Sequence, residues 1–404
     1  MTGREDGRFP AGPSGAAGTA GAPATTAGWA GWAVLGVGLA ALLAAVLADP
    51  DAAGAAAAQD WTPFVLVTGL LLVGLVASDD GLFDAGGRLM ARLAPGGWSL
   101  FAASAGLVAA VTAVLNLDTA VTFLTPVLVL AARRRRVDEL PFLYLAVFLA
   151  NGASLLLPGS NLTNLIVLGH RHLSGRAFAA DMLPAWVAAS VAVPVVLAAL
   201  YWRRLSRRPH RPTAVPATGS RVHLGVGVAG TVVAVVAALT LSGAAMALVV
   251  AGTGLAVAAW RTAGGRLAMT TVRHTVNLPV LVGLFGLAAA LGTLGRAWSG
   301  PEWLLAHAAS WEQAAIGAVA SVAVNNLPAA SLLAARTPPD PQALLVGLNL
   351  GPNLAVTGSL SAVLWLQAAR PLQAKTSVRR YTTLGLVVVP VSMAAALGAL
   401  RLFH

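Results

Sequence analysis

The 404-residue chain is 57% hydrophobic and only 10% charged, with a mean hydropathy of +0.77. This composition excludes an ordinary soluble domain and indicates a polytopic membrane protein. A net charge of +11 would suggest nucleic-acid binding in a soluble chain, but here the basic residues lie in short loops between apolar segments, where they orient the chain in a bilayer. The absence of cysteine excludes disulfides and thiolate sites, and we expect no cofactor, no metal and no nucleic-acid partner.

The first half of the chain begins with a segment that has no hydrophobic periodicity. Residues 1–27 are rich in Gly, Ala, Thr and Pro and are predicted to form a disordered cytoplasmic tail. The first span then leads outward to an acidic loop with Asp49, Asp51 and Asp60, and residues 79–97 are predicted to lie at the membrane interface. The apolar segments of this half are residues 28–48, 61–78, 98–115, 119–132, 140–169 and 183–202.

A basic, proline-containing stretch divides the chain into two halves. We expect a first repeat at residues 28–202, a cytoplasmic linker at 203–221 and a second repeat at 222–404. The apolar segments of the second half are residues 223–241, 244–260, 276–295, 312–324, 329–335, 342–366 and 381–403.

Two of these segments, 312–324 and 329–335, are too short to cross a bilayer core as helices. Joined into one span, they would leave the basic residues 370–380 outside, against the tendency for basic loops to be cytoplasmic. We therefore predict a re-entrant hairpin from the outer side, and by symmetry another at residues 98–132, where two full spans would fit the charges equally well. The N-terminus is then cytoplasmic and the C-terminus external.

Asp118 stands out among the 15 acidic residues because it lies deep in an apolar stretch, whereas the other 14 fall in loops or near segment ends. A carboxylate at membrane depth is costly and persists mainly where it faces a cavity, an ion or a proton path. Asp118 could instead cap the helix that follows, although a serine would cap without the same cost. We expect it to couple transport to protons.

Matching motifs recur in the two halves about 200 residues apart. Asn116-Leu117 in the first break resembles Asn326-Leu327 in the second, and the Gly-Ser pairs at 159–160 and 358–359 follow in the same order. Five crossings before the linker would give the second half the opposite orientation. The predicted fold is therefore an all-α polytopic membrane protein with two inverted-topology repeats, each with a re-entrant hairpin and a discontinuous transmembrane helix.

Polar residues in these breaks are the candidate binding site. Non-helical backbone at membrane depth is tolerated only inside protein or beside a wet cavity, and Asn side chains offer both donors and acceptors. The predicted substrate- or ion-binding residues are Asn116, Asp118, Thr119, Gly159, Ser160, Asn161, Asn164, Asn325, Asn326, Asn349, Gly351, Asn353, Thr357, Gly358 and Ser359. Any one of these polar groups could instead make a helix–helix hydrogen bond.

Four stretches, at residues 116–126, 150–166, 324–331 and 349–366, resemble the signatures of the arsenite/antimonite efflux permease family. That family belongs to a superfamily that includes citrate, dicarboxylate and sodium/proton carriers, and the similarity extends over about residues 30–403. It implies a scaffold domain, a mobile transport domain, a homodimer and proton-coupled or electrogenic export of trivalent arsenic and antimony hydroxides. A separate arsenical-pump ATPase is a possible partner. The chain departs from the family where Leu117 separates Asn116 from Asp118.

The predicted function is thus a secondary transporter of a small inorganic ion or oxyanion in the cell membrane. The four signatures contain no Arg or Lys, which suits an uncharged arsenic trihydroxide better than a dicarboxylate. A sodium/proton antiporter that uses Asp118 is the main alternative, and a citrate-type carrier is another. A membrane-embedded enzyme is less favoured, because the chain has no HExxH motif and no intramembrane GxSxG motif.

Overall fold

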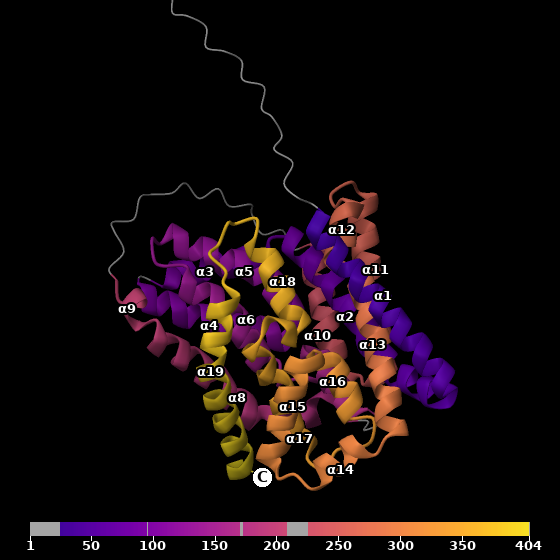
Figure 1. The fold of residues 1–404 in the computed structure, drawn as a ribbon. Helices are drawn as coiled ribbons and strands as arrows, with labels where there is room; N and C mark the ends of the chain where they lie inside the picture. Colours follow the sequence, from indigo (N-terminus) through magenta and orange to yellow (C-terminus); the bar gives the residue numbers. More distant parts are fainter. Residues whose placement is uncertain (1–24, 95, 170–172, 208–224, 404) are drawn as a thin grey trace, which may run out of the picture.

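The computed structural model describes residues 25–94, 96–169, 173–207 and 225–403. Most of the predicted tail and of the linker 203–221 lies outside these ranges. Across the described residues the chain consists of helices, short 3₁₀ turns and loops without a β-strand, which confirms the all-α prediction (Figure 1).

The described helices before the linker follow the predicted segments with few exceptions. They are α1 (Thr25–Ala48), α2 (Pro50–Asp79), α3 (Leu82–Leu93), α4 (Gly97–Val114), α5 (Leu117–Arg134), α6 (Leu140–Ala153), the 3₁₀ turn η1 (Pro158–Ser160), α7 (Leu162–Leu168), α8 (Gly175–Leu200) and α9 (Trp202–Leu205).

The remaining described elements begin at Val226. The helices are α10 (Val226–Thr240), α11 (Gly243–Ala263), α12 (Met269–Val276), α13 (Leu278–Ala297), α14 (Gly300–Ala306), α15 (Ser310–Val324), α16 (Asn326–Leu333), α17 (Pro341–Leu350), the 3₁₀ turns η2 (Gly351–Leu354) and η3 (Val356–Gly358), α18 (Leu360–Ala369) and α19 (Val378–Phe403).

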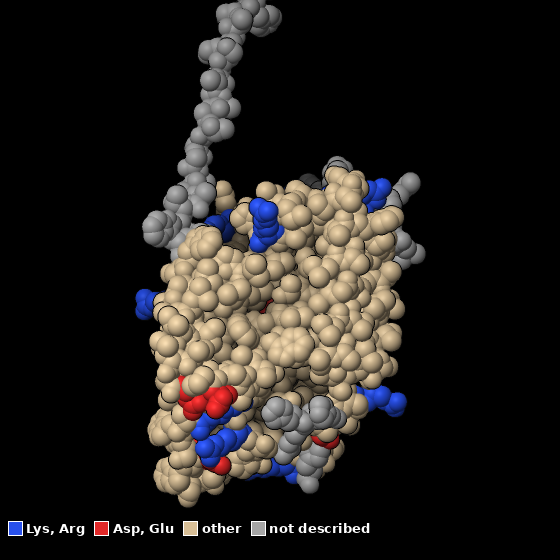
Figure 2. Space-filling model, turned by 90° about the vertical axis from the view of Figure 1, so that its right-hand side faces the viewer, with Lys and Arg blue, Asp and Glu red and all other residues tan. Residues whose placement is uncertain are grey.

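Seven helical segments in the described part of the chain are long and apolar enough to cross a membrane. They are Gly31–Ala48, Pro50–Asp79, Gly97–Val114, Gly175–Leu200, Gly243–Ala263, Met269–Ala297 and Val378–Phe403. On the face drawn in Figure 2, most charged side chains lie towards the upper and lower ends, and the wide zone between them is almost free of charge. The fold is therefore that of a multi-pass membrane protein.

The position of Asp60 corrects the sequence analysis. We expected Asp60 in an outer acidic loop, but α2 begins at Pro50, with Asp49 as its N-cap, and continues through Asp60 to Asp79. Asp49 accepts a hydrogen bond from the amide of Ala52 at 2.9 Å, and the alanine-rich residues 52–58 have a high helix propensity. Asp60 is 1% exposed, so Asp118 is not the only buried carboxylate within an apolar helix.

Helices α4 and α5 form a helical hairpin: the start of α4 and the end of α5 both lie next to α9. The indole of Trp98, at the start of α4, donates to Ser206 at 3.0 Å. Asp138, just after α5, forms an ion pair with Arg204. Amphipathic α3 packs against both arms.

Helices α15 and α16 form a second hairpin. The side chain of Gln313, near the start of α15, accepts a hydrogen bond from the amide of Asp340, beyond α16, at 3.1 Å. With 15 and 8 residues, neither arm reaches the length of a membrane span.

Each hairpin is followed by two helices that are separated by 3₁₀ turns, η1 in the first case and η2 and η3 in the second. In the first half α6 ends at Ala153 and α7 begins at Leu162; in the second, α17 ends at Leu350 and α18 begins at Leu360. The packing is crossed: α5 packs against α18, and α16 packs against α7. This arrangement brings the two hairpin tips and the two helix breaks together in the middle of the molecule.

Close backbone contact fixes the second hairpin against its interrupted helix. A Cβ atom on Gly347 would lie 2.0 Å from the carbonyl oxygen of Ala314, and one on Gly351 would lie 2.4 Å from the Cα of Ala318. Only glycine permits this separation, which is common between membrane helices. Glycine at these two positions therefore sets the distance between α15 and the break at η2.

Candidate functional site

The candidate site lies where four helices begin. Asn116 is the N-cap of α5 and accepts from the amide of Thr119 at 2.7 Å, and Asn161 is the N-cap of α7. Asn325 is the N-cap of α16, and Ser359 precedes α18. Helix N-termini carry partial positive charge and free N–H groups, so their convergence favours anions and polar oxygens.

A small cavity, here called the central cavity, lies between these helix N-termini. Its volume is about 10 Å³, which is room for about one water molecule. It is lined by Leu117, Asp118, Asn161, Leu162, Asn326, Leu327, Ser359, Leu360 and Ser361. Both hairpin tips and both helix breaks thus contribute, and none of the lining residues is basic.

Asp118 contributes the only acidic side chain of this lining. It is 2% exposed and forms neither a hydrogen bond nor an ion pair with any residue that the structure describes. The interpretation of Asp118 as the cap of α5 is wrong, because Asn116 caps that helix. A buried carboxylate without a protein partner needs an ion, a proton or a polar ligand beside it.

On the opposite hairpin, Asn326 has an unpaired side-chain amide. Its side chain is 3% exposed and makes no hydrogen bond among the described residues. The caps also give the register of the two tips: Asn116 corresponds to Asn325, so the sequence match of Asn116 with Asn326 is displaced by one residue. Leu117 and Asp118 on one tip then correspond to Asn326 and Leu327 on the other.

The remaining asparagines of the interrupted helices bond to each other across the two halves. Asn349 accepts from Asn161 at 2.6 Å and from Ser154 at 2.7 Å, and it donates to Asn164 at 2.9 Å. Asn353 accepts from Asn151 at 2.8 Å. These buried amides form a network, here called the asparagine network, that joins α6–α7 to α17–α18.

Backbone carbonyls freed at the breaks also find partners within the protein. Asn164 donates to the carbonyls of Ser154 at 2.8 Å and Leu157 at 3.0 Å. In the first half Trp186 of α8 donates to Ala153 at 3.0 Å, and in the second Tyr381 of α19 donates to Pro352 at 3.3 Å. These carbonyls are therefore bonded within the protein and are not free to bind a ligand.

The other predicted residues lie around the central cavity without lining it. Ser160 donates to the carbonyl of Ala113 at 3.0 Å and ties η1 to α4, while Thr119 reaches the carbonyl of Leu70 at 3.4 Å. Asn325 donates to the carbonyl of the exposed Thr357 at 3.3 Å. The glycines Gly159, Gly351 and Gly358 are buried in the 3₁₀ turns.

Sequence reasoning missed three polar residues of this region. Ser361 lines the central cavity and shares a 2.7 Å hydrogen bond with Ser359. Asn151 and Ser154 belong to the asparagine network. Each lies two to eight residues from the nearest predicted residue, so the spacing of polar side chains around the breaks could have identified them.

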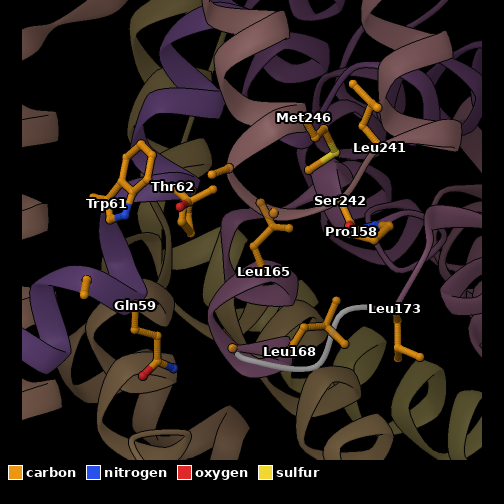
Figure 3. Close-up of a pocket in the computed structure, with 15 residues that line it drawn as sticks. Gln59, Trp61, Thr62, Pro158, Leu165, Leu168, Leu173, Leu241, Ser242 and Met246 are labelled. Atoms are coloured by element: carbon orange, nitrogen blue, oxygen red, sulfur yellow. The ribbon is translucent and has the colours of Figure 1, made fainter.

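A second and larger cavity, here called the lateral cavity, lies between α2, α7 and the loop that joins α10 to α11. Its volume is about 260 Å³. Figure 3 shows Leu165 and Leu168 of α7 on one side of it, Trp61 and Thr62 of α2 on another, and Gln59 below. Most of its lining is apolar, and of the predicted residues none takes part.

The sequence matches a family of known proteins. The model of the citrate transporter family CitMHS matches residues 28–349. The arsenical pump membrane protein of Escherichia coli (strain K12) is 27% identical over 91% of this chain and 94% of its own length, and that of Yersinia enterocolitica is 26% identical over 85% and 86%.

Two further similarities are more limited. The silicon efflux transporter LSI3 of Oryza sativa subsp. japonica is 28% identical over 38% of this chain and 31% of its own. The crystal structure of the Alcanivorax borkumensis YdaH transporter covers 84% of this chain and 83% of that one, at 17% identity and a TM-score of 0.45.

The family match and the two arsenical pump proteins confirm the resemblance that the four signatures indicated. Because the family model matches most of the chain, including both hairpins and the first interrupted helix, the protein belongs to the citrate transporter (CitMHS) family of membrane transporters.

Proposed function

We propose that this chain is a secondary transporter that exports arsenite and antimonite across the cytoplasmic membrane, driven by a proton gradient or by the membrane potential. The observation that carries the proposal is the central cavity, where one unpaired carboxylate and one unpaired amide lie among four helix N-termini and no basic side chain is present. The arsenical pump proteins that resemble the chain over nearly its whole length support the same substrate.

The chemistry of the cavity fits an uncharged trihydroxide. Arsenite near neutral pH carries three hydroxyl groups, each of which can donate one hydrogen bond and accept others. Asp118 accepts such bonds, Asn326 both donates and accepts, and Ser359 and Ser361 do both. Citrate would require its negative charges to be balanced in a cavity without Arg or Lys.

The size of the cavity requires a conformational change. A space of about 10 Å³ admits no arsenite, so the hairpin tips must separate from the helix breaks before substrate enters. We infer that the four-part lining closes around substrate and opens to one side of the membrane at a time. Contacts across the cavity between α5 and α18, and between α16 and α7, support this role.

Asp118 is the proposed coupling residue. It is costly as a buried anion, and it has no hydrogen-bond or ion-pair partner in the described chain. Burial favours the protonated, neutral carboxyl, whereas the partial positive charge of the four helix N-termini favours the ionised carboxylate. The two effects oppose each other, so both protonation states are accessible. Exchange of a proton for arsenite at Asp118 would link the two fluxes.

We also propose that the hairpins are re-entrant and that the halves form inverted repeats. The base of the first hairpin lies at α9 and that of the second near α14; in Figure 1, α9 is at the left edge and α14 at the lower edge of the molecule. Cytoplasmic basic segments then place the N-terminus inside and the C-terminus outside. The division into residues 28–202 and 222–404, the homodimer and a pump ATPase partner stay part of this proposal.

A sodium/proton antiporter is the second candidate, because Asp118 is a carboxylate that could hold sodium. Everted vesicles offered arsenite, antimonite, sodium or citrate, each with and without a proton gradient, separate the candidates. We expect gradient-dependent uptake of arsenite and antimonite. Proton movement driven by sodium without arsenite uptake would favour the antiporter, and citrate uptake would favour the carboxylate carrier.

A further inference from the structure

A second buried carboxylate lies away from the central cavity. Asp60 of α2 is 1% exposed and accepts one hydrogen bond, from Ser331 of α16, at 2.9 Å. Its other oxygen, Oδ1, is buried and has no hydrogen-bond partner. Such a group is rare in a folded protein and calls for a specific explanation.

The surroundings of Asp60 contain one cation that is already engaged. Arg296 of α13 donates to the side chain of Gln59 and to the carbonyl of Gly292. It makes no direct ion pair with Asp60, but it lies close enough for the two charges to attract each other. Helices α1, α7 and α10, which pack on α2, carry no charged residue, and neither does α16, which reaches α2 through Ser331 and packs mainly on α13 and α15. Arg261 of α11 pairs with Asp80 at the other end of α2.

Gln59 joins the neighbourhood of Asp60 to both halves of the protein. Its amide nitrogen donates to the carbonyl of Ile166 in α7 at 2.9 Å and to that of Ala334, just after α16, at 3.2 Å. Residues 59 and 60 therefore hold the two helices, α7 and α16, whose N-termini line the central cavity. Gln59 also lines the lateral cavity, which is large enough for several waters (Figure 3).

We propose that Asp60 is a proton-binding site that controls whether α16 is held against α2. Ionised, Asp60 accepts the hydroxyl hydrogen of Ser331 and ties the second hairpin to α2. When a proton binds, the carboxyl becomes a weaker acceptor, and the hydroxyl of Ser331 turns to its alternative acceptor, the carbonyl of Leu327 in its own helix at 3.3 Å. Low pH then removes this tie between α16 and α2 and loosens the tip at Asn326, while the bond of Gln59 to Ala334 remains.

The site acts beside Asp118 rather than in place of it. Ser331 lies five residues beyond Asn326 on the same short helix, so motion of α16 reaches the central cavity directly. The coupling to export rests on the proposed function. Proton binding and release of α16 do not, because both can be measured without substrate.

Infrared difference spectra recorded on acidifying the purified protein in lipid test proton binding. The C=O band of a protonated carboxylic acid from Asp60 is expected in the parent protein and in Asp51→Asn, a change of an exposed carboxylate in the same helix. It should be absent in Asp60→Asn and present in Asp118→Asn. An unchanged set of bands in Asp60→Asn would overturn the proposal.

Thiol labelling tests the release of α16 in this cysteine-free chain. Leu332→Cys reports on α16, and Ala263→Cys, at the exposed end of α11, corrects for the pH dependence of the thiol reaction. The ratio of their labelling rates should rise about tenfold as the pH falls, which corresponds to the loss of one hydrogen bond to a charged group.

Two variants decide the cause of that rise. Asp60→Asn should make the ratio independent of pH, and Ser331→Ala should hold it at the high value while leaving the carboxyl band in place. Should Asp60→Asn not fold, Ser331→Ala alone decides. A ratio that still changes with pH in either variant would overturn the proposal, as would a response to sodium at constant pH with none to protons.

Discussion

At the scale of single residues, the site depends on which polar groups the protein itself leaves unpaired. Asp118 and Asn326 line the central cavity without a hydrogen-bond partner in the described chain. By contrast, the side chain of Asn116 caps α5, and that of Asn349 belongs to the asparagine network. Buried polar groups are almost always satisfied, so we propose these two, which line the same cavity, as the ligand-binding groups.

Alanine substitutions at the two tips separate these roles. Asn326→Ala removes an unpaired amide and should reduce arsenite transport at least about tenfold with little loss of folded protein, since packing is nearly retained. Asn116→Ala removes the cap of α5 and should cost about 1 kcal/mol of stability as well. Transport in vesicles and the yield of monodisperse protein in detergent measure both. Normal transport by Asn326→Ala would contradict its role as a ligand.

Asn325 carries backbone strain at the tip of the second hairpin. Its φ of 78° and ψ of 148° belong to a region that only glycine adopts easily. Asn325→Gly should therefore raise the free energy of unfolding by about 1 kcal/mol, because the glycine relieves strain and a glycine cap costs only a few tenths.

Asn277→Gly is the matched control for this effect. Asn277 has φ 46° and ψ 55°, a left-handed conformation that asparagine tolerates, so its replacement should change stability little. Thermal unfolding of both variants in detergent gives the comparison. A midpoint for Asn325→Gly at or below that of Asn277→Gly would show that the tip is not strained.

At the scale of elements, the asparagine network holds the two interrupted helices in one unit. Asn349 bonds to three side chains of the first half, Ser154, Asn161 and Asn164. Hydrogen bonds from Trp186 and Tyr381 to backbone carbonyls at the breaks add to this network. Because these bonds hold the interrupted helices together, we propose that the hairpins move to admit substrate.

Truncation of Asn349 should therefore destabilise the protein rather than only impair binding. Asn349→Ala strands the three partners in a buried site, at a cost of at least about 3 kcal/mol. We expect a lower unfolding midpoint and less membrane-inserted protein, in contrast to Asn326→Ala. An unfolding midpoint equal to that of the parent protein would mean that the network contributes nothing to stability.

The same elements mark what sequence could and could not predict. The breaks at 116–118 and 325–326 were predicted because polar residues interrupt apolar runs, and α15 and α16 were recognised from their lengths. The contacts of Asn349 with Asn164, 185 residues away, leave no local signal. Asp60 was assigned to a loop because charge near a segment end usually marks one, whereas the preceding alanines extend the helix past it.

At the scale of the whole molecule, buried charge pairs and uncharged surfaces fit a protein embedded in lipid. Asp80 and Arg261 form a buried ion pair that ties the end of α2 to α11. The amide of Gly227 in α10 also donates to Asp80, at 2.8 Å. This cluster fixes three helices at one end of the fold, and most charges on the face in Figure 2 lie likewise towards its ends.

The orientation of the chain is testable with single cysteines. The basic residues near 203–221 and 370–380 predict that both segments are cytoplasmic. Cysteines in place of Ser206 and Ser377 should both resist an impermeant thiol reagent added to whole cells and react after the cells are permeabilised. Rapid labelling at position 377 with protection at 206 would show that α15 and α16 cross the membrane as a single span.

The central claim is that Asp118 couples protons to substrate in the central cavity. Uptake of arsenite into everted vesicles, measured with and without a proton gradient, tests it most directly. The parent protein should accumulate arsenite when the gradient is present. Asp118→Asn retains the size of the side chain and should lose that accumulation while still exchanging arsenite downhill. Accumulation by Asp118→Asn against a gradient, with the pH dependence of the parent, would contradict the claim.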